Sequence, residues 1–217
     1  MSEIITNEKQ WHQARLSGIG ASESSAILGL NPYMSNVDLW EIKTGRKKAP
    51  DISSDAHVAY GHAAEGPLRE LFALDYPQYE VTYGGAFDLV RNEKYPFIFA
   101  TLDGRLKERA TGRLGVLEVK TTEILKSMTY EKWNGQLPQN YFCQVLWQLL
   151  ATGWEYVEVT AQLKRIYGDE VRTETRRYHI ERSEKQDSMD YLLEEAVKFW
   201  GYVQRDEKPP RVLPNIF

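Results

Sequence analysis

Cysteine is scarce in this chain of 217 residues, which contains one, Cys143. A single thiol excludes a disulfide framework, a four-thiolate zinc site and a cysteine-ligated iron–sulfur cluster, because each of these needs several sulfur atoms. Long apolar runs are missing as well: no stretch approaches the ~18 consecutive apolar residues that cross a bilayer, and the first residues have neither the basic nor the apolar segment of a secretory signal. We therefore expect a cytoplasmic protein in a reducing compartment, with no membrane role.

An excess of positive charge is also lacking, since the net charge is −4 at pH 7. A polyanion would weakly repel such a chain as a whole, so any nucleic-acid binding must use local basic surface. Hydrophobic residues make up 42% of the chain and aromatic residues 12%, which suffices for a buried core and excludes a disordered chain. We expect residues 1–217 to form a single domain with a helical entry, a C-terminal helix and an extended tail, because no repeat or long linker is visible.

Apolar spacing and turn residues divide the chain into helices and strands. Helices are expected over residues 8–16, 22–28, 37–43, 55–75, 138–152 and 183–204. Strands are expected over residues 79–83, 86–90, 97–102 and 114–119, followed by a hairpin of 154–166 and 171–180. Ser22 is the expected cap of the second helix, and Pro67 is expected to kink or break the fourth. Pro209, Pro210 and Pro214 favour an extended tail. This order of elements predicts an α/β fold with a mixed β-sheet core flanked by helices.

Two carboxylates and an amine stand at the ends of predicted strands. Asp103 is followed, after fourteen intervening residues, by Glu118-Val119-Lys120. Because alternate residues of a strand share a face, Glu118 and Lys120 point the same way and Val119 points into the core. If Asp103 comes from the adjacent strand, the two carboxylates need a cation, and Mg²⁺ would suit metal-assisted phosphodiester hydrolysis. Alone, the same pattern is more often a solvated ion pair on a surface strand.

Further motifs resemble the PD-(D/E)XK nuclease superfamily, and within it the family of YqaJ-like viral recombinases and phage lambda exonuclease. The matching segments, in chain order, are Trp11-His12-x-x-Arg15-Leu16 with Ala21-Ser22-Glu23, Tyr60-Gly61-x-x-x-Glu65, Ala100-x-x-Asp103-Gly104, Leu117-Glu118-Val119-Lys120, and Gln144-Val145. Each motif alone is weak evidence for the resemblance, but the occurrence of all five in the order of the family is strong evidence. The resemblance implies a restriction-endonuclease-like fold.

The resemblance also implies a role for individual residues. Asp103, Glu118 and the carbonyl of Val119 would bind Mg²⁺, for which Mn²⁺ would substitute. Lys120 would be the catalytic lysine, with Glu65 and Gln144 assisting. Gln148, one turn after Gln144, is expected to be an ordinary polar residue. The implied pocket for a 5′-phosphate consists of Arg15, Ser22 and Thr101, and a guanidinium fork with hydroxyl donors suits phosphate oxygens.

The activity implied by the family is a 5′ to 3′ exonuclease that degrades one strand of double-stranded DNA and leaves 3′ single strands for recombination. A homotrimeric ring, a single-strand annealing protein as partner, and a phage or prophage origin in a bacterial host are implied with it. Two alternatives remain open from the residues: a site-specific or structure-specific endonuclease on the same core, and a catalytically silent module that binds DNA ends.

The sequence departs from the family pattern at two positions and suggests further DNA contacts. Thr101 stands where the family has a serine and keeps the hydroxyl, and Leu102 replaces the usual proline. Val58 falls where an apolar wedge splits the duplex in the lambda enzyme. Candidate phosphate contacts are the basic loop Arg46-Lys47-Lys48 and the hairpin residues Lys164, Arg165, Arg172, Arg176 and Arg177, which otherwise only solubilise edge strands.

Overall fold

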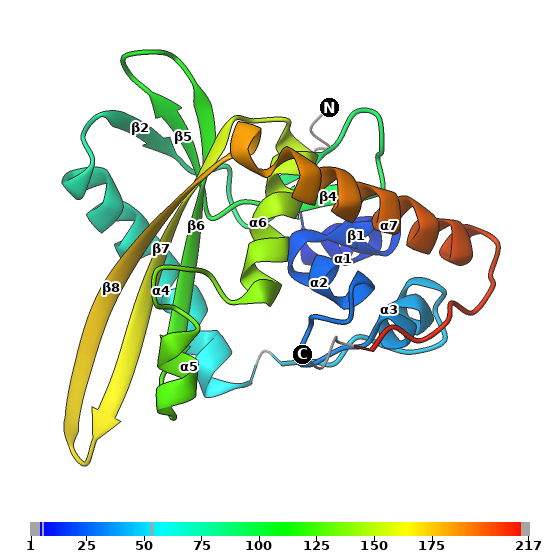
Figure 1. Ribbon diagram of the computed structural model, residues 1–217, viewed down its shortest axis with the longest axis horizontal. Coiled ribbons are helices and arrows are strands. Elements are labelled where there is room, and N and C mark those ends of the chain that lie inside the picture. The colour runs from blue at the N-terminus through cyan, green and yellow to red at the C-terminus, as the bar shows by residue number, and fades with distance from the viewer. Residues whose placement is uncertain (1–4, 6, 53, 214–217) are drawn as a thin grey trace.

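The computed structural model describes residues 5, 7–52 and 54–213 and contains two β-sheets with helices packed around them (Figure 1). The helices are α1 (Glu8–Leu16), α2 (Ser24–Ile27), α3 (Asn36–Lys43), α4 (Ala56–Asp75), α5 (Ser127–Glu131), α6 (Gln139–Thr152) and α7 (Gln186–Gln204), with 3₁₀ turns η1 (Ala21–Glu23) and η2 (Arg182–Lys185). The strands are β1 (Ile19–Gly20), β2 (Tyr79–Thr82), β3 (Leu89–Arg91), β4 (Ile98–Thr101), β5 (Gly104–Glu108), β6 (Leu114–Glu123), β7 (Tyr156–Tyr167) and β8 (Glu170–Glu181). Among the described residues, no helix combines the length and apolar character that a membrane span requires.

The larger sheet has the strand order β2-β5-β6-β7-β8, and the smaller has the order β1-β4-β3. The β6–β7 and β1–β4 pairs are parallel and the other pairs are antiparallel, so both sheets are mixed. A parallel pair needs a crossover connection, and α5 and α6 form the one between β6 and β7. The expected α/β architecture with a mixed sheet and flanking helices is confirmed. The long β7–β8 hairpin extends away from the helical part of the molecule (Figure 1).

The core lies on both faces of the larger sheet. Val116 of β6 packs in the cluster that contains Val145 and Trp147 of α6. Its neighbour Leu117 packs instead with Leu68 and Phe72 of α4, and Val119 belongs to this second cluster. Successive side chains of β6 therefore enter opposite layers, as the two-residue period of a strand requires. The alternation expected around Val119 is what positions the polar residues on either side of it.

Helix α4 continues through Pro67, so a break near Gly66 does not occur. Proline removes one backbone hydrogen bond from a helix interior, which costs about 3 kcal/mol. Burial of Leu68 and Phe72 just beyond the proline offsets that cost, at roughly 1.5–3 kcal/mol for each side chain. Tertiary packing thus holds a helix that the local sequence disfavours.

Several expected boundaries are wrong for identifiable reasons. Strand β5 and helix α5 were not expected, because β5 carries charged residues at three of its five positions and α5 is only five residues long. Strand β6 runs to Glu123 rather than Val119. Ser22 does not cap a helix: the turn η1 begins after Gly20, whose N–H donates to Glu23 Oε2 at 2.7 Å. The tail has no helix or strand over residues 207–213, as expected, and Pro214 lies outside the described residues.

The imidazole of His179 on β8 bridges two carboxylates. Nδ1 lies 2.7 Å from Glu158 Oε1 and Nε2 lies 3.1 Å from Glu181 Oε1. Burial lowers the pKa of His179, but the hydrogen bonds and charges of Glu158 and Glu181 outweigh this effect and raise the pKa above its ordinary value of 6.5. A group whose folded-state pKa is raised stabilises the fold at pH values below its unfolded pKa and loses that contribution as the pH rises through the folded pKa.

We therefore expect the free energy of unfolding to decline as the pH rises above the ordinary histidine pKa of 6.5, partly because of His179. The His179→Gln variant should show a shallower decline in urea unfolding measured across this range. An unchanged slope in His179→Gln would contradict the assignment.

Candidate active site

Asp103 and Glu118 meet at the point where two strands stop pairing. Strand β5 is antiparallel to β6, and Gly104 at its start lies opposite Leu117. Asp103 precedes β5 and therefore sits beside β6 just beyond the last ladder pair. The N–H of Val119 donates to Asp103 Oδ2 at 2.8 Å. The carboxylate thus occupies the place that a β5 backbone carbonyl would take if the ladder continued.

Glu118 is enclosed between β6 and α6, with a residue exposure of 1%. The amide of Gln144 donates from Nε2 to Oε1 at 2.7 Å. The amide of Gln148 donates to Oε2, and the ammonium of Lys120 pairs with Oε1. Three donors from one strand and one helix therefore hold a carboxylate that solvent barely reaches.

The electrostatics of this group leave a deficit of positive charge. Burial and the neighbouring charge of Glu118 raise the pKa of Asp103 well above its ordinary value of 3.8, although Lys120 and the Val119 N–H act in the opposite direction. Burial alone would lower the pKa of Lys120, but the charges of Glu118 and Asp103 raise it, so this amine is an ammonium ion. One ammonium faces the buried carboxylate of Glu118 and the half-buried carboxylate of Asp103, an arrangement that favours a further cation.

The donor atoms suit a hard divalent cation. Asp103 and Glu118 offer carboxylate oxygens, and Val119 offers a carbonyl, because the N–H and C=O of one strand residue point to the same edge. Mg²⁺ is usually held by one or two carboxylates and retains several waters. Across residues 5, 7–52 and 54–213, no three His, Cys, Asp or Glu side chains form a complete metal-binding group. Main-chain, water or substrate oxygens would therefore complete the coordination.

Glu65 approaches the same site from α4. Its charge contributes to the raised pKa of Asp103, and its Oε1 lies 3.2 Å from His62 Nδ1. One turn later, Arg69 donates from Nη1 to the carbonyl oxygen of Asp103 at 2.7 Å and stacks over Tyr83, 4.0 Å from the ring centroid. Arg69 was not anticipated from the sequence, although its position four residues after Glu65 places it on the same helix face.

A second charged cluster surrounds Arg15. Its guanidinium lies 3.5 Å from Glu23 Oε1 and 4.7 Å from the ring centroid of Trp11. Lys43 Nζ donates to Glu23 Oε2 at 2.8 Å and to the Arg15 carbonyl oxygen at 2.9 Å. Burial would raise the pKa of Glu23, but Lys43 and Arg15 lower it, so the carboxylate is ionised. Two cations and one anion give this cluster a net positive charge.

Ser22 and Thr101 lie at the same end of the smaller sheet. Strands β1 and β4 are parallel, with Gly20 opposite Phe99, so the residues that follow Gly20 and Phe99 run in the same direction. Ser22 is exposed in η1, next to Glu23. The Thr101 hydroxyl is buried and has no hydrogen-bond partner in the part of the chain that the structure describes. A buried hydroxyl without a partner costs free energy, so this oxygen is suited to a ligand.

The expectation for Gln148 is wrong. Its side chain is fully buried, and its amide hydrogen-bonds to Glu118. The signal in the sequence was its spacing from Gln144, since residues four apart share one face of a helix. Two polar side chains on the buried face of α6 indicate a polar partner opposite them.

The basic side chains considered as DNA contacts are largely paired within the protein. Arg46 binds Asp206 through two hydrogen bonds of 2.5 and 2.8 Å, and Lys47 lies 2.5 Å from Asp38. The hairpin arginines have neighbours too: Arg172 binds Glu170, Arg176 binds Glu174 and the Trp133 carbonyl, Arg177 binds Thr160 and Asp75, and Arg165 stacks over Tyr130. Lys164 lies over the ring of Tyr60, and Val58 is half-buried on α4.

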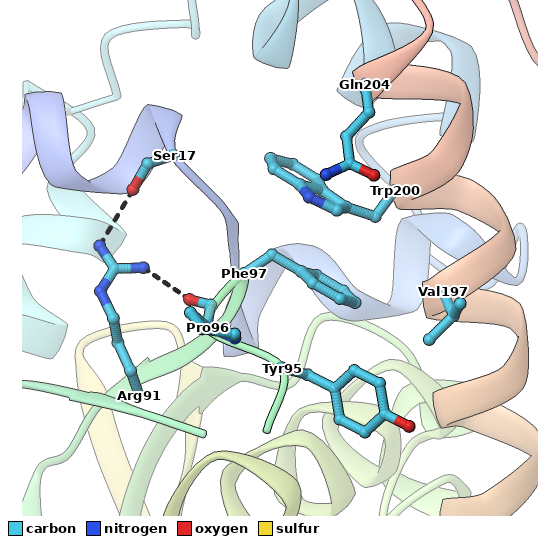
Figure 2. Close-up of a pocket in the computed structure, with 8 residues that line it drawn as sticks. All are labelled: Ser17, Arg91, Tyr95, Pro96, Phe97, Val197, Trp200 and Gln204. Atoms are coloured by element: carbon cyan, nitrogen blue, oxygen red, sulfur yellow. Dashed lines mark hydrogen bonds between the residues drawn. The ribbon is translucent and has the colours of Figure 1, made fainter. Parts of the chain in front are cut away.

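A cavity of about 630 Å³ lies between the end of α1, the turn before β4, and α7 (Figure 2). None of the carboxylate-site residues lines it. Its cation, Arg91, donates to the Pro96 carbonyl at 2.9 Å, to Ser17 Oγ at 3.1 Å and to the Ala14 carbonyl at 3.0 Å. Arg91 therefore fixes the end of α1, the helix that carries Arg15. The positive charge of Arg91 in this cavity is engaged in hydrogen bonds within the protein.

The sequence matches the YqaJ-like viral recombinase domain over residues 10–155. It is 31% identical over 155 residues to the uncharacterized protein YqaJ of Bacillus subtilis (strain 168), a match that covers 71% of this chain. The same match covers 45% of the length of YqaJ, so the chain corresponds to less than half of that protein.

Solved structures share the fold. The alkaline exonuclease LHK-Exo from Laribacter hongkongensis superposes with a TM-score of 0.69 at 17% identity, covering 92% of this chain and 94% of that one. A phage-related exonuclease from Haemophilus somnus 129PT gives a TM-score of 0.56 at 12% identity, covering 87% of this chain and 96% of that one. The arrangement of sheets and helices around Asp103 and Glu118 is therefore that of a known exonuclease fold.

The charge balance at the site predicts opposite effects for two isosteric substitutions. Asp103→Asn removes a repelled carboxylate and keeps an oxygen for the Val119 N–H, so it should raise the free energy of unfolding by on the order of 1 kcal/mol at pH 8 with a chelator present. Glu118→Gln replaces one accepting oxygen by an amide NH₂ group that faces the donors of Gln144, Gln148 or Lys120, and it should lower the free energy of unfolding by roughly 3 kcal/mol. Urea unfolding followed by circular dichroism measures both, and destabilisation by Asp103→Asn would argue against the charge deficit.

Proposed function

The chain belongs to the YqaJ-like viral recombinase family, and from that premise we propose that it is a Mg²⁺-dependent exonuclease that degrades one strand of duplex DNA in the 5′ to 3′ direction. The observation that carries this proposal is the convergence of Asp103, Lys120 and the buried Glu118 in a group with too little positive charge. Proteins that share the fold support it, since they are exonucleases and LHK-Exo has been solved in complex with dAMP.

In this proposal Asp103, Glu118 and the Val119 carbonyl hold the divalent ion. When bound, Mg²⁺ supplies an activated water and neutralises charge that develops on the scissile phosphate. Gln144 fixes the orientation of Glu118 through its amide. Lys120, whose pKa is raised by the neighbouring carboxylates, donates hydrogen bonds to the attacking water and to a phosphate oxygen. Glu65 assists from α4, with Mn²⁺ able to replace Mg²⁺.

The Arg15 cluster would hold the 5′-phosphate. Its net positive charge attracts the phosphate, and the Thr101 hydroxyl, which has no partner among the described residues, would donate to one of its oxygens. Ser22 adds a second hydroxyl at the same end of the smaller sheet. Thr101 is also two residues from Asp103, so an anchored phosphate would stand a fixed distance from the site of cleavage. Such an anchor favours stepwise removal of nucleotides from an end.

The product of this reaction is a 3′ single-stranded overhang. We propose that a single-strand annealing protein receives it for phage-type recombination. A homotrimeric ring around the duplex would place three sets of basic side chains about one channel. This local positive surface would attract DNA although the net charge of each chain is −4.

A nuclease assay tests the activity. A 5′-phosphorylated linear duplex should be consumed from its ends in Mg²⁺, with no reaction in a chelator and no cutting of a closed circle. Lys120→Ala should reduce the rate by at least about 100-fold, the range for loss of one donor that stabilises developing charge. Cutting of the circle would favour an endonuclease, and binding without cutting would favour a silent end-binding module.

The phosphate pocket is tested by the chemistry of the DNA end. Arg15→Ala should abolish the preference for 5′-phosphorylated over 5′-hydroxyl ends, and it should slow digestion of phosphorylated ends by roughly 10- to 100-fold, the loss of one charge-assisted contact. Digestion of 5′-hydroxyl ends should change little. Arg172→Ala, on the hairpin, is the matched control and should keep the preference. A preference retained in Arg15→Ala would exclude this pocket.

A further inference from the structure

The hydrogen bonds of Glu118 distinguish its two oxygens. An ionised carboxylate has about four lone-pair positions, two on each oxygen. Oε1 accepts from Gln144 and is paired with Lys120, so both of its positions are taken. Oε2 accepts from Gln148, which leaves one position on that oxygen. The orientation of this remaining position depends on the bond from Gln148.

Gln148 is an unusual residue for its place in the fold. It is fully buried on α6, between Trp147 and Leu149, both of which are also buried in the core. Its own carbonyl oxygen, Oε1, is buried without a hydrogen-bond partner among the described residues. A buried amide that pairs only its donor is destabilising compared with an apolar side chain of similar volume. As a donor, Gln148 offsets part of the cost of burying Glu118, and its single side-chain hydrogen bond is directed at that carboxylate.

We propose that Gln148 is a positioning residue, which holds Glu118 so that Oε2 presents its free lone pair to the divalent ion. Gln148 touches neither the ion nor the DNA and acts through Glu118. This inference rests on the proposed function, because it assigns Gln148 a role in the metal site of that reaction. Hydrogen-bond partners of metal ligands typically contribute 10- to 100-fold to metal affinity or activity.

The test is Mg²⁺ binding measured by calorimetry on the complete chain without DNA. Gln148→Met keeps the volume and removes the donor, so it should weaken Mg²⁺ binding by about 10-fold or more. Cys143→Ala is the matched control: Cys143 lies on the same helix, is 5% exposed, and is not a hydrogen-bond partner of Glu118. It should bind Mg²⁺ as the wild type does. Far-UV circular dichroism and cooperative melting check the fold of each variant.

Kinetics separate positioning from a general loss of structure. In Gln148→Met the Mg²⁺ concentration for half-maximal cleavage should rise, whereas the rate at saturating Mg²⁺ should be largely retained. If Gln148→Met does not fold, Gln148→Asn keeps the polarity with an amide one methylene too short to reach Glu118, and it should show the same weakened binding.

Equal Mg²⁺ affinity in the wild type and in a folded Gln148 variant would overturn the inference while leaving the proposed function intact. Absence of both Mg²⁺ binding and cleavage in the wild type would refute the proposed function itself, and the role of Gln148 with it. The two failures are therefore distinguishable in one set of measurements.

Discussion

The structure is organised around two carboxylates, one of them buried, that lie where β5 stops pairing with β6. Ending the ladder at Gly104 and Leu117 frees the edge of β6, and the next N–H along that edge, from Val119, binds the Asp103 carboxylate instead. Enclosing this pair costs free energy unless donors surround it. Lys120 of the same strand and two glutamines of α6 supply those donors. The crossover helix between β6 and β7 thus covers the sheet and completes the site.

The sequence was most informative where a strict period applies. The two-residue repeat of a strand placed Glu118 and Lys120 on one face and Val119 on the other, and the packing of Val119 against α4 agrees. It was less informative where polar residues dominate. Strand β5 alternates buried Gly104 and Leu106 with exposed or half-exposed charged residues, a pattern too short to separate from a loop. Gln148 was misjudged because an apolar core pattern says nothing about a carboxylate arriving from another element.

The basic surface shows a similar limit. A run of arginines in a sequence predicts a phosphate-binding surface, but here Arg46, Arg172 and Arg176 each face a carboxylate. Some of these partners are distant along the sequence: Arg46 and Asp206 are separated by 160 positions. The residues around an arginine therefore do not reveal its carboxylate partner. Exposed ion pairs of this kind contribute little free energy, because solvent and salt screen them. Breaking such a pair therefore costs little, so these arginines remain available to an external anion although the chain is acidic overall.

Asp103 is held by its backbone and its side chain at once, through Arg69 on its carbonyl and Val119 on its carboxylate. Lys120 is different, because its ammonium sits on a flexible four-carbon stem. The chain therefore carries a counterion for these carboxylates on the same strand as Glu118. Fixed anions and a flexible cation on neighbouring elements therefore make part of the charge balance internal to the chain.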